Sequence, residues 1–298
     1  MSITSASERV WFITGSSSGL GLDITRHVLS KGDIAVATLR KPEVLDELVA
    51  EYPKERLLVL KVDVTVHQDI LDAFKKTKEV FGRIDVVVSN AGTGLLSEVE
   101  GTPDDVARAL FDVNFWGSVH VLQEAVRFLR DENAPGKGGR VFQITSGMEL
   151  VGFPGCGFYS ATKHAIGGLA QSLAKEVDPA WNIKLTIIAL GAFGTNAVNA
   201  MAKLPVHPAY VNPDLVVAKW RKAMIQSQSG VFDPTLTIKG DAAKAAGAIY
   251  RLSEVDAPPL RIPLGCVDLA RGATKDFSDE VEKWASWSEG LDKDEYQN

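Results

Sequence analysis

The chain has 298 residues, of which 45% are hydrophobic and 23% are charged, and its formal net charge is -6 at pH 7. This composition is typical of a globular protein, and the acidic balance excludes a basic surface for nucleic acid or anionic membranes. Apolar runs stay shorter than the ~20 residues needed to cross a bilayer, and the segment before Val10 lacks the pattern of a signal peptide. With two cysteines, Cys156 and Cys266, we expect a reducing, cytoplasmic environment and no metal site.

Short apolar runs alternate with amphipathic stretches along most of the chain. The runs predict strands because they are brief, rich in Val, Ile and Leu, and end at turn residues. Strands are expected at Val10–Thr14, Ile34–Thr38, Leu57–Val62, Ile84–Ser89, Val141–Thr145, Ile183–Ala189 and Arg261–Leu264. Helices are expected at Leu20–Lys31, Pro42–Glu51, Gln68–Phe81, Pro103–Leu129, Tyr159–Val177, Asp214–Gln226 and Asp241–Leu252. This alternation predicts a doubly wound α/β fold, a parallel sheet with helices on both faces.

The alternation breaks at about residues 190–238, where prolines accompany apolar residues around the expected helix Asp214–Gln226. We find no internal repeat, low-complexity tract or linker, so residues 1–298 are predicted to form a single domain. Residues 190–238 are then a substrate-loop segment within it. The tail carries Trp284 and Trp287 among charged residues, and it fits either a docking helix or a frayed end.

A glycine-rich turn, Thr14-Gly-Ser-Ser-Ser-Gly-Leu-Gly21, lies between the first expected strand and the first expected helix. Its glycines permit a tight turn and a close approach of the backbone, and the following helix N-terminus presents free N–H groups to an anion. The combination is typical of a dinucleotide pyrophosphate site, although a glycine trio alone also fits an ordinary turn. The residues expected to bind there are Gly15, Ser17, Ser18, Gly19, Leu20 and Gly21.

Two further motifs follow the glycine turn in order: Asn90-Ala-Gly92 and Tyr159-Ser-Ala-Thr-Lys163. In this combination the sequence resembles the short-chain dehydrogenases/reductases over about residues 9–195, with weaker likeness to Leu264. The resemblance implies a Rossmann-type fold, and a dimer or tetramer of identical subunits. It also implies that Asn90, Ala91 and Gly92 support the adenosine side of the cofactor. Asp63, in the pair Asp63-Val64, would contact the adenine amine of the cofactor. The alternative is that Asp63 only closes a turn.

The choice between NAD and NADP is expected at the end of the second strand, in Ala37-Thr-Leu-Arg-Lys41. An acidic residue there bonds the ribose 2′-hydroxyl of NAD, whereas a nearby arginine accepts the 2′-phosphate of NADP. Thr38 occupies the acidic position, and Arg40 is placed to reach the phosphate, with Ser16 or Ser17 as hydroxyl donors. We therefore expect the cofactor to be NADP(H) rather than NAD(H). The alternative is that Arg40 is only a solvated charge on a loop.

Tyr159 and Lys163 are four residues apart at the start of an expected helix, so both side chains project from one face. A lysine ammonium one turn away is expected to lower the phenol pKa from its usual value of about 10. By the resemblance, Tyr159 protonates the substrate oxygen as hydride arrives, and Lys163 also holds the nicotinamide ribose. Ser146 would bond the substrate oxygen, and Asn114 would hold a water of the proton relay. Each residue alone also fits a structural role.

One departure from the family pattern follows the sixth expected strand, in Leu190-Gly-Ala-Phe-Gly-Thr195. Leucine stands where the family has proline, and the loss of a fixed φ angle is expected to loosen this loop. Thr195 remains the expected partner of the nicotinamide carboxamide. The residues expected to wall the substrate pocket are Met148, Leu150, Val151, Phe153, Phe158, Phe193, Met201, Leu204 and Tyr210.

The predicted function is therefore NADP(H)-dependent hydride transfer to or from a hydrophobic ketone, aldehyde or secondary alcohol, since the expected pocket walls are apolar. Two alternatives stay open. One is a non-catalytic NADP(H)-binding sensor or scaffold protein. The other is an epimerase or dehydratase of the extended relatives, against which the three-residue gap between Gly15 and Gly19 counts.

Overall fold

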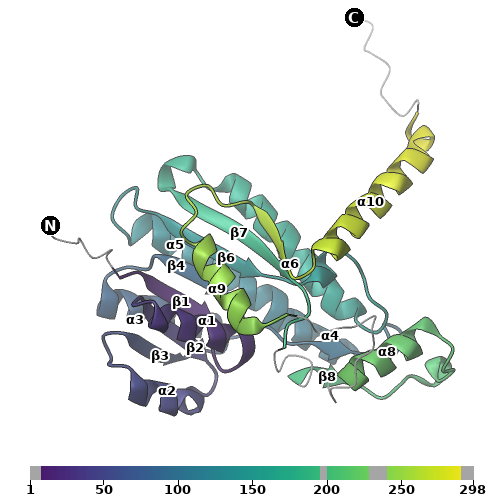
Figure 1. The fold of residues 1–298 in the computed structure, drawn as a ribbon, viewed down its shortest axis with the longest axis horizontal. Helices are drawn as coiled ribbons and strands as arrows, with labels where there is room; N and C mark the ends of the chain where they lie inside the picture. Colours follow the sequence, from purple (N-terminus) through teal and green to yellow (C-terminus); the bar gives the residue numbers. More distant parts are fainter. Residues whose placement is uncertain (1–7, 195–199, 228–239, 290–298) are drawn as a thin grey trace, which may run out of the picture.

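The computed structural model describes residues 8–194, 200–227 and 240–289. Its main sheet is parallel and has the strand order β3-β2-β1-β4-β6-β7-β9 (Figure 1). The strands are β1 (Val10–Thr14), β2 (Ile34–Leu39), β3 (Leu57–Lys61), β4 (Val86–Ser89), β6 (Gly139–Ile144), β7 (Ile183–Leu190) and β9 (Arg261–Leu264). The order reverses between β1 and β4, and ligands bind at such a switch point in open α/β sheets. The predicted doubly wound fold is confirmed.

Helices cover both faces of this sheet. The α-helices of the described residues are α1 (Gly19–Ser30), α2 (Asp46–Glu51), α3 (His67–Phe81), α4 (Asp104–Phe111), α5 (Gly117–Asp131), α6 (Gly157–Glu176), α8 (Val216–Ser227), α9 (Ala242–Leu252) and α10 (Val267–Trp284), and α10 lies outside these two layers (Figure 1). One core cluster lies between the sheet and α3, α5 and α6, and a second lies between the sheet and α1 and α9.

Strand β1 shows why a continuous apolar run in the sequence indicates a strand that is buried on both faces. Successive side chains of a strand point to opposite faces, so Val10 and Phe12 enter the first cluster while Trp11 and Ile13 enter the second. All four are buried. A strand covered on both faces needs apolar residues at every position rather than at alternate ones.

The predicted helix Pro103–Leu129 is interrupted in the structure. Helix α4 passes into a π-helical turn, η2 (Asp112–Trp116), before α5 begins at Gly117. A Cβ atom at Gly117 would lie 2.8 Å from Val64 Cγ2, so this glycine lets the turn approach the chain after β3 closely. A second difference is a small parallel pair, β5 (Leu95–Leu96) with β8 (Ala202–Lys203), which the sequence analysis did not predict.

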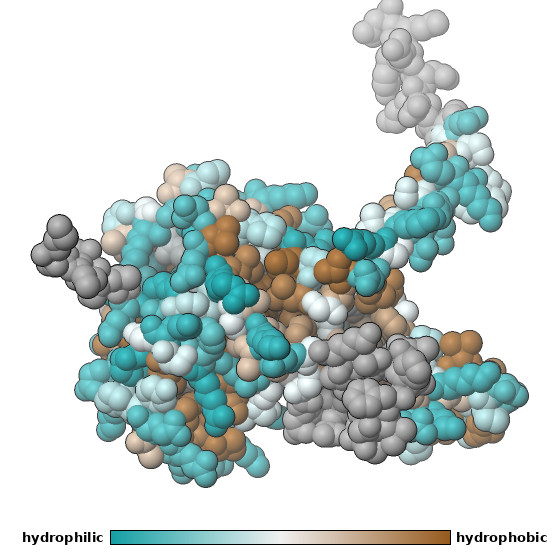
Figure 2. Space-filling model, viewed as in Figure 1, coloured by the Kyte–Doolittle hydropathy of each residue, from teal (hydrophilic) through white to brown (hydrophobic). Residues whose placement is uncertain are grey.

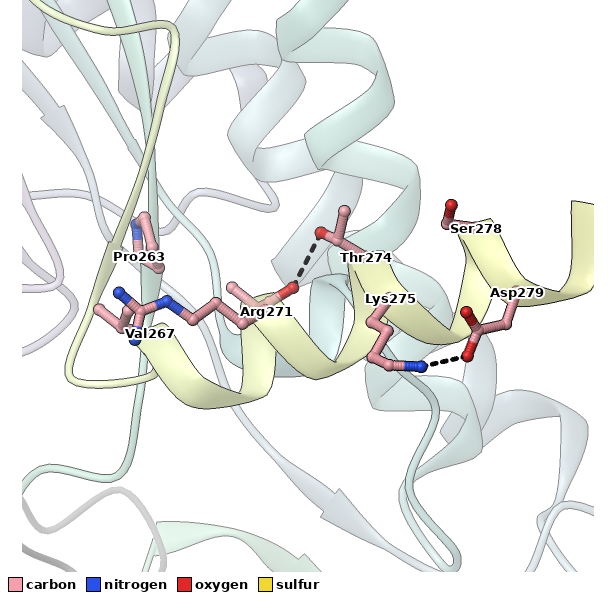
Figure 3. A pocket seen from close by; sticks show the side chains of 8 residues that line it. Pro263, Val267, Arg271, Thr274, Lys275, Ser278 and Asp279 are labelled. Atoms are coloured by element: carbon pink, nitrogen blue, oxygen red, sulfur yellow. Dashed lines mark hydrogen bonds and ion pairs between the residues drawn. The ribbon is translucent and has the colours of Figure 1, made fainter. Parts of the chain in front are cut away.

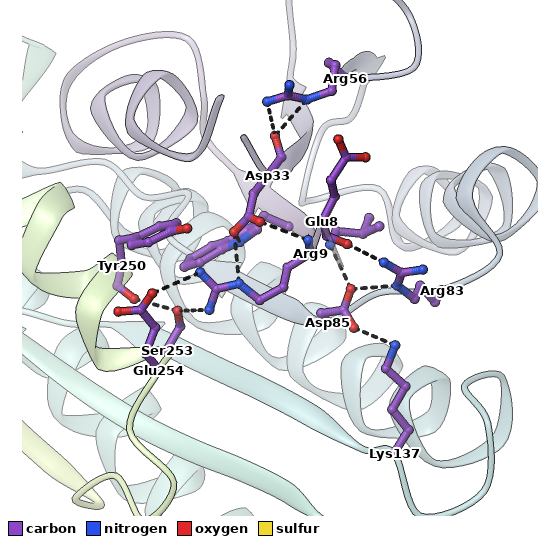
Figure 4. Close-up of polar contacts among 12 residues, drawn as sticks. Glu8, Arg9, Asp33, Arg56, Arg83, Asp85, Lys137, Tyr250, Ser253 and Glu254 are labelled. Carbon is purple, nitrogen blue, oxygen red and sulfur yellow. Dashed lines mark hydrogen bonds and ion pairs between the residues drawn. The ribbon is translucent and has the colours of Figure 1, made fainter. Parts of the chain in front are cut away.

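At the amino ends of the strands, a polar network centred on Arg9 ties the sheet to α9 (Figure 4). Asp33 accepts hydrogen bonds from Arg9 Nε at 2.9 Å and Trp11 Nε1 at 3.0 Å, and Arg9 Nη1 donates to Ser253 Oγ at 2.7 Å. The Arg9 guanidinium also lies 4.6 Å from the ring centroid of Tyr250. These charges are paired with one another, so we interpret the network as structural.

The tail forms a helix rather than a frayed end through residue 284. Helix α10 extends away from the body of the protein, as Figure 1 shows. Across the three described segments of the chain, no helix combines the length and the apolarity that crossing a membrane requires.

Candidate active site

The glycine turn after β1 has the geometry of a cradle for an anion. Gly15 and Gly19 adopt left-handed φ angles of 71° and 54°, which side chains other than glycine rarely take. A Cβ atom at Gly21 would lie 2.3 Å from the Gly15 carbonyl oxygen. The turn therefore closes only with glycine at 21, and it leads directly into α1, whose first turn includes the buried Leu20. Ser17 and Ser18 are exposed at its rim.

Asn90 joins this turn to the loop that follows β4. Its Nδ2 donates to the Thr14 carbonyl oxygen at 2.9 Å, while Thr14 Oγ1 accepts from the N–H groups of Asn90 and Ala91 at 2.9 and 3.0 Å. The side chain of Asn90 thus holds the two loops together across the switch point. Sequence reasoning missed the part played by Thr14, which a lone threonine at a strand end does not signal.

At the ends of β2 and β3, Arg40 and Asp63 lie near each other. Arg40 is exposed directly after β2, and Asp63 Oδ1 accepts hydrogen bonds from Thr65 N at 3.0 Å and Thr65 Oγ1 at 2.8 Å. Burial alone would raise the pKa of Asp63, but these bonds and the charge of Arg40 bring it below its usual value. Asp63 is therefore charged and also closes a turn, and its neighbour Val64 is buried.

Two hydroxyl groups, one in β2 and one just after β1, point inward. Thr38 Oγ1 and Ser16 Oγ both donate to the Ile13 carbonyl oxygen, at 3.1 and 3.0 Å, and Ser16 is completely buried. The expectation that Ser16 offers a hydroxyl to a bound phosphate is therefore wrong, because its proton is already engaged inside the turn. Of the two serines, only Ser17 remains available for that part.

The proposed catalytic side chains meet where β6 ends and α6 begins. The side chains of Ser146 and Tyr159 are hydrogen-bonded. Lys163 lies one turn further along α6, with its Nζ 5.7 Å from the centroid of the Tyr159 ring. A Cβ atom at Gly92 would be 3.5 Å from this Nζ, so the loop after β4 forms the opposite wall. A phenol, a hydroxyl and an ammonium group that converge in this way can exchange a proton with a bound oxygen.

The pKa of Tyr159 shifts opposite to our expectation. Burial raises the pKa of Tyr159 to about 12, against the effect of the Ser146 hydrogen bond, and lowers the pKa of Lys163 to about 8. Desolvation penalises the charged form of each group, and it is the largest cause of both shifts. The buried Glu149 carboxylate opposes the shift of Lys163.

Asn114 lies in the π-helical turn, and its side chain makes three hydrogen bonds. Its Oδ1 accepts from Thr93 N at 2.8 Å, and its Nδ2 donates to the Thr93 carbonyl oxygen at 2.8 Å and to Thr162 Oγ1 at 3.2 Å. The residue is fully buried. Its amide therefore fastens the loop after β4 to α6, next to Tyr159 and Lys163.

Comparisons with known proteins identify this arrangement. Residues 9–204 match the family described as short chain dehydrogenase. The chain belongs to the short-chain dehydrogenase family. An uncharacterized oxidoreductase of Schizosaccharomyces pombe is 35% identical over 95% of this chain and 92% of its own length. The oxidoreductase BOA17 of Botryotinia fuckeliana is also 35% identical, over 94% of this chain and 98% of its own.

A solved structure supports the same assignment. The crystal structure of a short-chain dehydrogenase from Streptomyces avermitilis superposes with a TM-score of 0.83 at 33% sequence identity. The match covers 97% of this chain and 100% of the other. The predicted family is thus confirmed, and this chain is an oxidoreductase of the short-chain dehydrogenase family.

In this short-chain dehydrogenase, the segment after β7 keeps its order up to Gly194 despite the missing proline. Leu190 still pairs with Leu264 of β9, and Gly191 N donates to the Leu264 carbonyl oxygen at 2.8 Å. Gly194 N donates to the Gly240 carbonyl oxygen, also at 2.8 Å. Hydrogen bonds to β9 and to Gly240 thus tie down residues 190–194 although leucine stands in place of the proline. Thr195 lies outside the described residues.

Beside Tyr159, the dehydrogenase has a third, smaller apolar cluster. Phe153 and Trp220 stack in it with ring centroids 4.8 Å apart. Of the expected pocket walls, Phe193 lies elsewhere, against Gly240 and Gly265, and Tyr210 donates from its hydroxyl to Glu100 at the surface. Because Met148, Phe153 and Met201 are among the expected pocket walls, we name this set the substrate cluster. Its members are Leu96, Met148, Phe153, Cys156, Met201, Trp220 and Met224.

A buried ion pair, which sequence reasoning missed, fixes α8 over the substrate cluster. Arg221 Nη2 donates to both carboxylate oxygens of Glu98 at 2.9 Å, and its Nε donates to Oε1 at 3.1 Å. Arg221 Nη1 donates to the Leu204 carbonyl oxygen at 2.9 Å, and His207 N donates to Glu98 Oε2 at 3.3 Å. Together with the β5–β8 pair, these bonds attach residues 200–227 to the loop after β5.

Proposed function

We propose that this short-chain dehydrogenase is an NADP(H)-dependent enzyme that transfers hydride between the nicotinamide and a hydrophobic ketone, aldehyde or secondary alcohol. The convergence of Ser146, Tyr159 and Lys163 beside the glycine cradle carries the proposal. A binding protein without turnover needs the cradle but has no use for the converging proton donors. We also propose a cytoplasmic protein that works as a homo-oligomer.

The cradle fits a dinucleotide. Its close backbone contact at Gly21 and its exposed helix N-terminus suit a pyrophosphate, which Gly15, Ser17, Ser18, Gly19 and Leu20 would hold with them. We assign the adenosine side to Asp63, Val64, Asn90, Ala91 and Gly92, the ribose of the nicotinamide to Lys163, and its carboxamide to Thr195. When bound, the nicotinamide supplies or accepts the hydride.

The proton chemistry falls to Tyr159. With a pKa of about 12 the phenol stays protonated at neutral pH, so it can donate its proton to a carbonyl oxygen during reduction. Ser146, which already bonds the phenol, would hold the same oxygen. Lys163, with a pKa of about 8, keeps most of its positive charge at pH 7 and favours the phenolate as it forms. We also assign to Asn114 the binding of a water molecule in a proton relay, in addition to fastening the loop after β4 to α6.

The substrate cluster favours an apolar molecule. Its members are aliphatic, aromatic or sulfur-containing, and the buried Arg221 of α8 is neutralised by Glu98. A charged substrate would therefore lose its hydration without gaining a counter-charge from these residues. The direct test is oxidation of NADPH and NADH with a panel of hydrophobic ketones and aldehydes. Tight NADPH binding without turnover on any of them would favour the sensor or scaffold alternative.

Replacing Gly21 by alanine is expected to weaken NADPH binding more than tenfold and to destabilise the fold. The added methyl group meets the Gly15 carbonyl oxygen at 2.3 Å, and such overpacking costs about 1–3 kcal/mol. Gly168, exposed in α6 with open space around its Cβ position, is the matched control. Gly168→Ala should instead add about 0.5–1 kcal/mol of stability. NADPH fluorescence titration and thermal unfolding measure both variants, and unchanged NADPH affinity in Gly21→Ala would contradict the cradle.

Arg40→Ala is expected to weaken NADPH binding about 10- to 100-fold while leaving NADH binding unchanged. A charge-assisted bond contributes about 1.5–3 kcal/mol, and only NADPH carries the 2′-phosphate that receives it. Lys54→Ala, another exposed cation after α2, controls for the general loss of one positive charge. Titration of each variant with both cofactors measures the ratio. An equal loss of affinity for NADH and NADPH would rule out Arg40 as the discriminating residue.

A further inference from the structure

Helix α10 leaves the body of the protein without a partner for most of its length. None of its residues is buried, although its 18 residues extend roughly 27 Å at 1.5 Å per residue. Its base is attached beside the catalytic serine, because a Cβ atom at Gly147 would lie 2.8 Å from Leu269 Cδ2. Figure 2 shows hydrophobic surface gathered where this base meets the body.

The sequence of α10 places apolar and small residues at alternating intervals of three and four. That spacing puts them on one face of the helix and is typical of the seam between two paired helices. Phe277 and Trp284 on this seam are 69% and 51% exposed, and Trp287 just beyond it is 78% exposed. The residues of the α10 seam are Val267, Ala270, Thr274, Phe277, Val281 and Trp284.

The two halves of the seam differ in shape. The first half provides most of the lining of a groove of about 540 Å³, which also includes Pro263 of β9 and, from the second half, Ser278 and Asp279 (Figure 3). The second half carries the exposed aromatic rings. At roughly 150–250 Å² per aromatic side chain, the exposed parts of Phe277, Trp284 and Trp287 offer on the order of 400 Å², about half of one side of a standard interface. The groove adds to that area.

The two halves also differ in charge. Residues 267–275 carry Asp268, Arg271 and Lys275, for a net charge of +1. Residues 276–284 carry four acidic residues and Lys283, for a net charge of -3. Two copies of α10 side by side and antiparallel would therefore set each positive half against a negative half, and each aromatic half against a groove. A parallel pair would instead set like halves together.

We propose that α10 is a dimerisation arm, and that the α10 helices of two copies of this chain pair antiparallel along the α10 seam. A two-fold axis makes such a contact self-complementary, so both grooves and both aromatic halves are used at once. An anionic membrane surface fits the arm less well, because its aromatic half is also its acidic half. The contact would place the partner beside Gly147, next to the catalytic Ser146.

Sedimentation equilibrium of the full-length protein tests the arm with a matched pair of substitutions. Val281→Glu puts a charge into the seam, whereas Val80→Glu puts the same charge on α3, and the two valines are 48% and 44% exposed. We expect Val281→Glu to weaken association at least tenfold and to yield a smaller species, while Val80→Glu keeps the wild-type mass. A wild-type monomer, or a Val281→Glu protein of wild-type mass, would overturn the proposal. So would a monomer that binds phosphatidylcholine vesicles through α10.

Charge exchange separates pairing from mere unfolding of the arm. Arg271→Glu with Lys275→Glu makes the arm acidic throughout, and Asp279→Lys with Glu280→Lys and Glu282→Lys makes it basic throughout. Each variant alone should be the smaller species, and an equimolar mixture should recover the wild-type mass as a heterodimer. Failure of the mixture to associate would overturn the antiparallel pairing. Neither measurement depends on catalysis, so the outcome is independent of the proposed function.

Discussion

Tyr159→Phe is expected to slow NADPH-dependent carbonyl reduction by a factor of roughly 10² to 10⁴, the usual contribution of a positioned acid or base. Phenylalanine keeps the ring, and with it the packing against Lys163, but removes the hydroxyl group that bonds Ser146. Binding of NADPH should stay within about threefold of the wild type, since the cradle is formed by other residues. Steady-state kinetics and NADPH titration on the same preparation measure the two effects separately.

The control for this variant is Tyr52→Phe, which removes a phenol hydroxyl at the end of α2, far from β6 and α6. Its activity should equal that of the wild type. Turnover of Tyr159→Phe at the wild-type rate would refute the acid role of the phenol. Loss of NADPH binding together with turnover would show instead that Tyr159 acts by holding the cofactor.

The parts of the fold that the sequence predicted are those where each residue's own chemistry decides its place. Trp11 and Phe12 face opposite clusters, so β1 needs apolar residues at every position, and that run is visible in the sequence. Gly15 and Gly19 adopt φ angles that favour glycine, so the turn can be predicted from these glycines in the sequence. The spacing of Tyr159 and Lys163 likewise follows from one helical turn.

The parts that escaped prediction depend on contacts between distant segments. Glu98 and Arg221 are 123 residues apart, and no local pattern links them. The strands β5 and β8 have two residues each, too few for an alternation to be seen. The interruption at Asn114 lies inside a stretch whose apolar residues keep a helical period on both sides.

The pKa of Tyr159 illustrates the same limit within the site. The sequence predicts a lowered pKa for Tyr159, because Lys163 lies four residues further along the same helix and this spacing can be read from the sequence alone. Desolvation depends instead on everything packed around the phenol, and it raises the pKa to about 12. The direction of the shift was therefore set by tertiary packing, which spacing alone does not show.

Arg221→Met is expected to cost on the order of 3 kcal/mol and to loosen the segment over the substrate cluster, because it leaves Glu98 buried without its counter-charge. Glu98 and Arg221 have side chains only 3% and 9% exposed. The pKa of Glu98 lies below its usual value although burial acts to raise it, since Arg221 and backbone N–H groups bond the charged form. Thermal unfolding measures the cost, and hydrogen exchange in β8 and α8 locates it.

Two comparisons make the Arg221 prediction specific. Arg108→Met breaks a similar bond to Asp104, but both side chains are well exposed, so stability should hardly change. The double variant Glu98→Met/Arg221→Met removes both charges and should regain most of the lost stability, since no lone charge stays buried. In kinetics, Arg221→Met should raise the KM for a hydrophobic ketone more than it lowers kcat, because α8 covers the substrate cluster and not Tyr159. An equal loss of stability in the single and double variants would show that packing of the long side chain, rather than the ion pair, holds α8 in place.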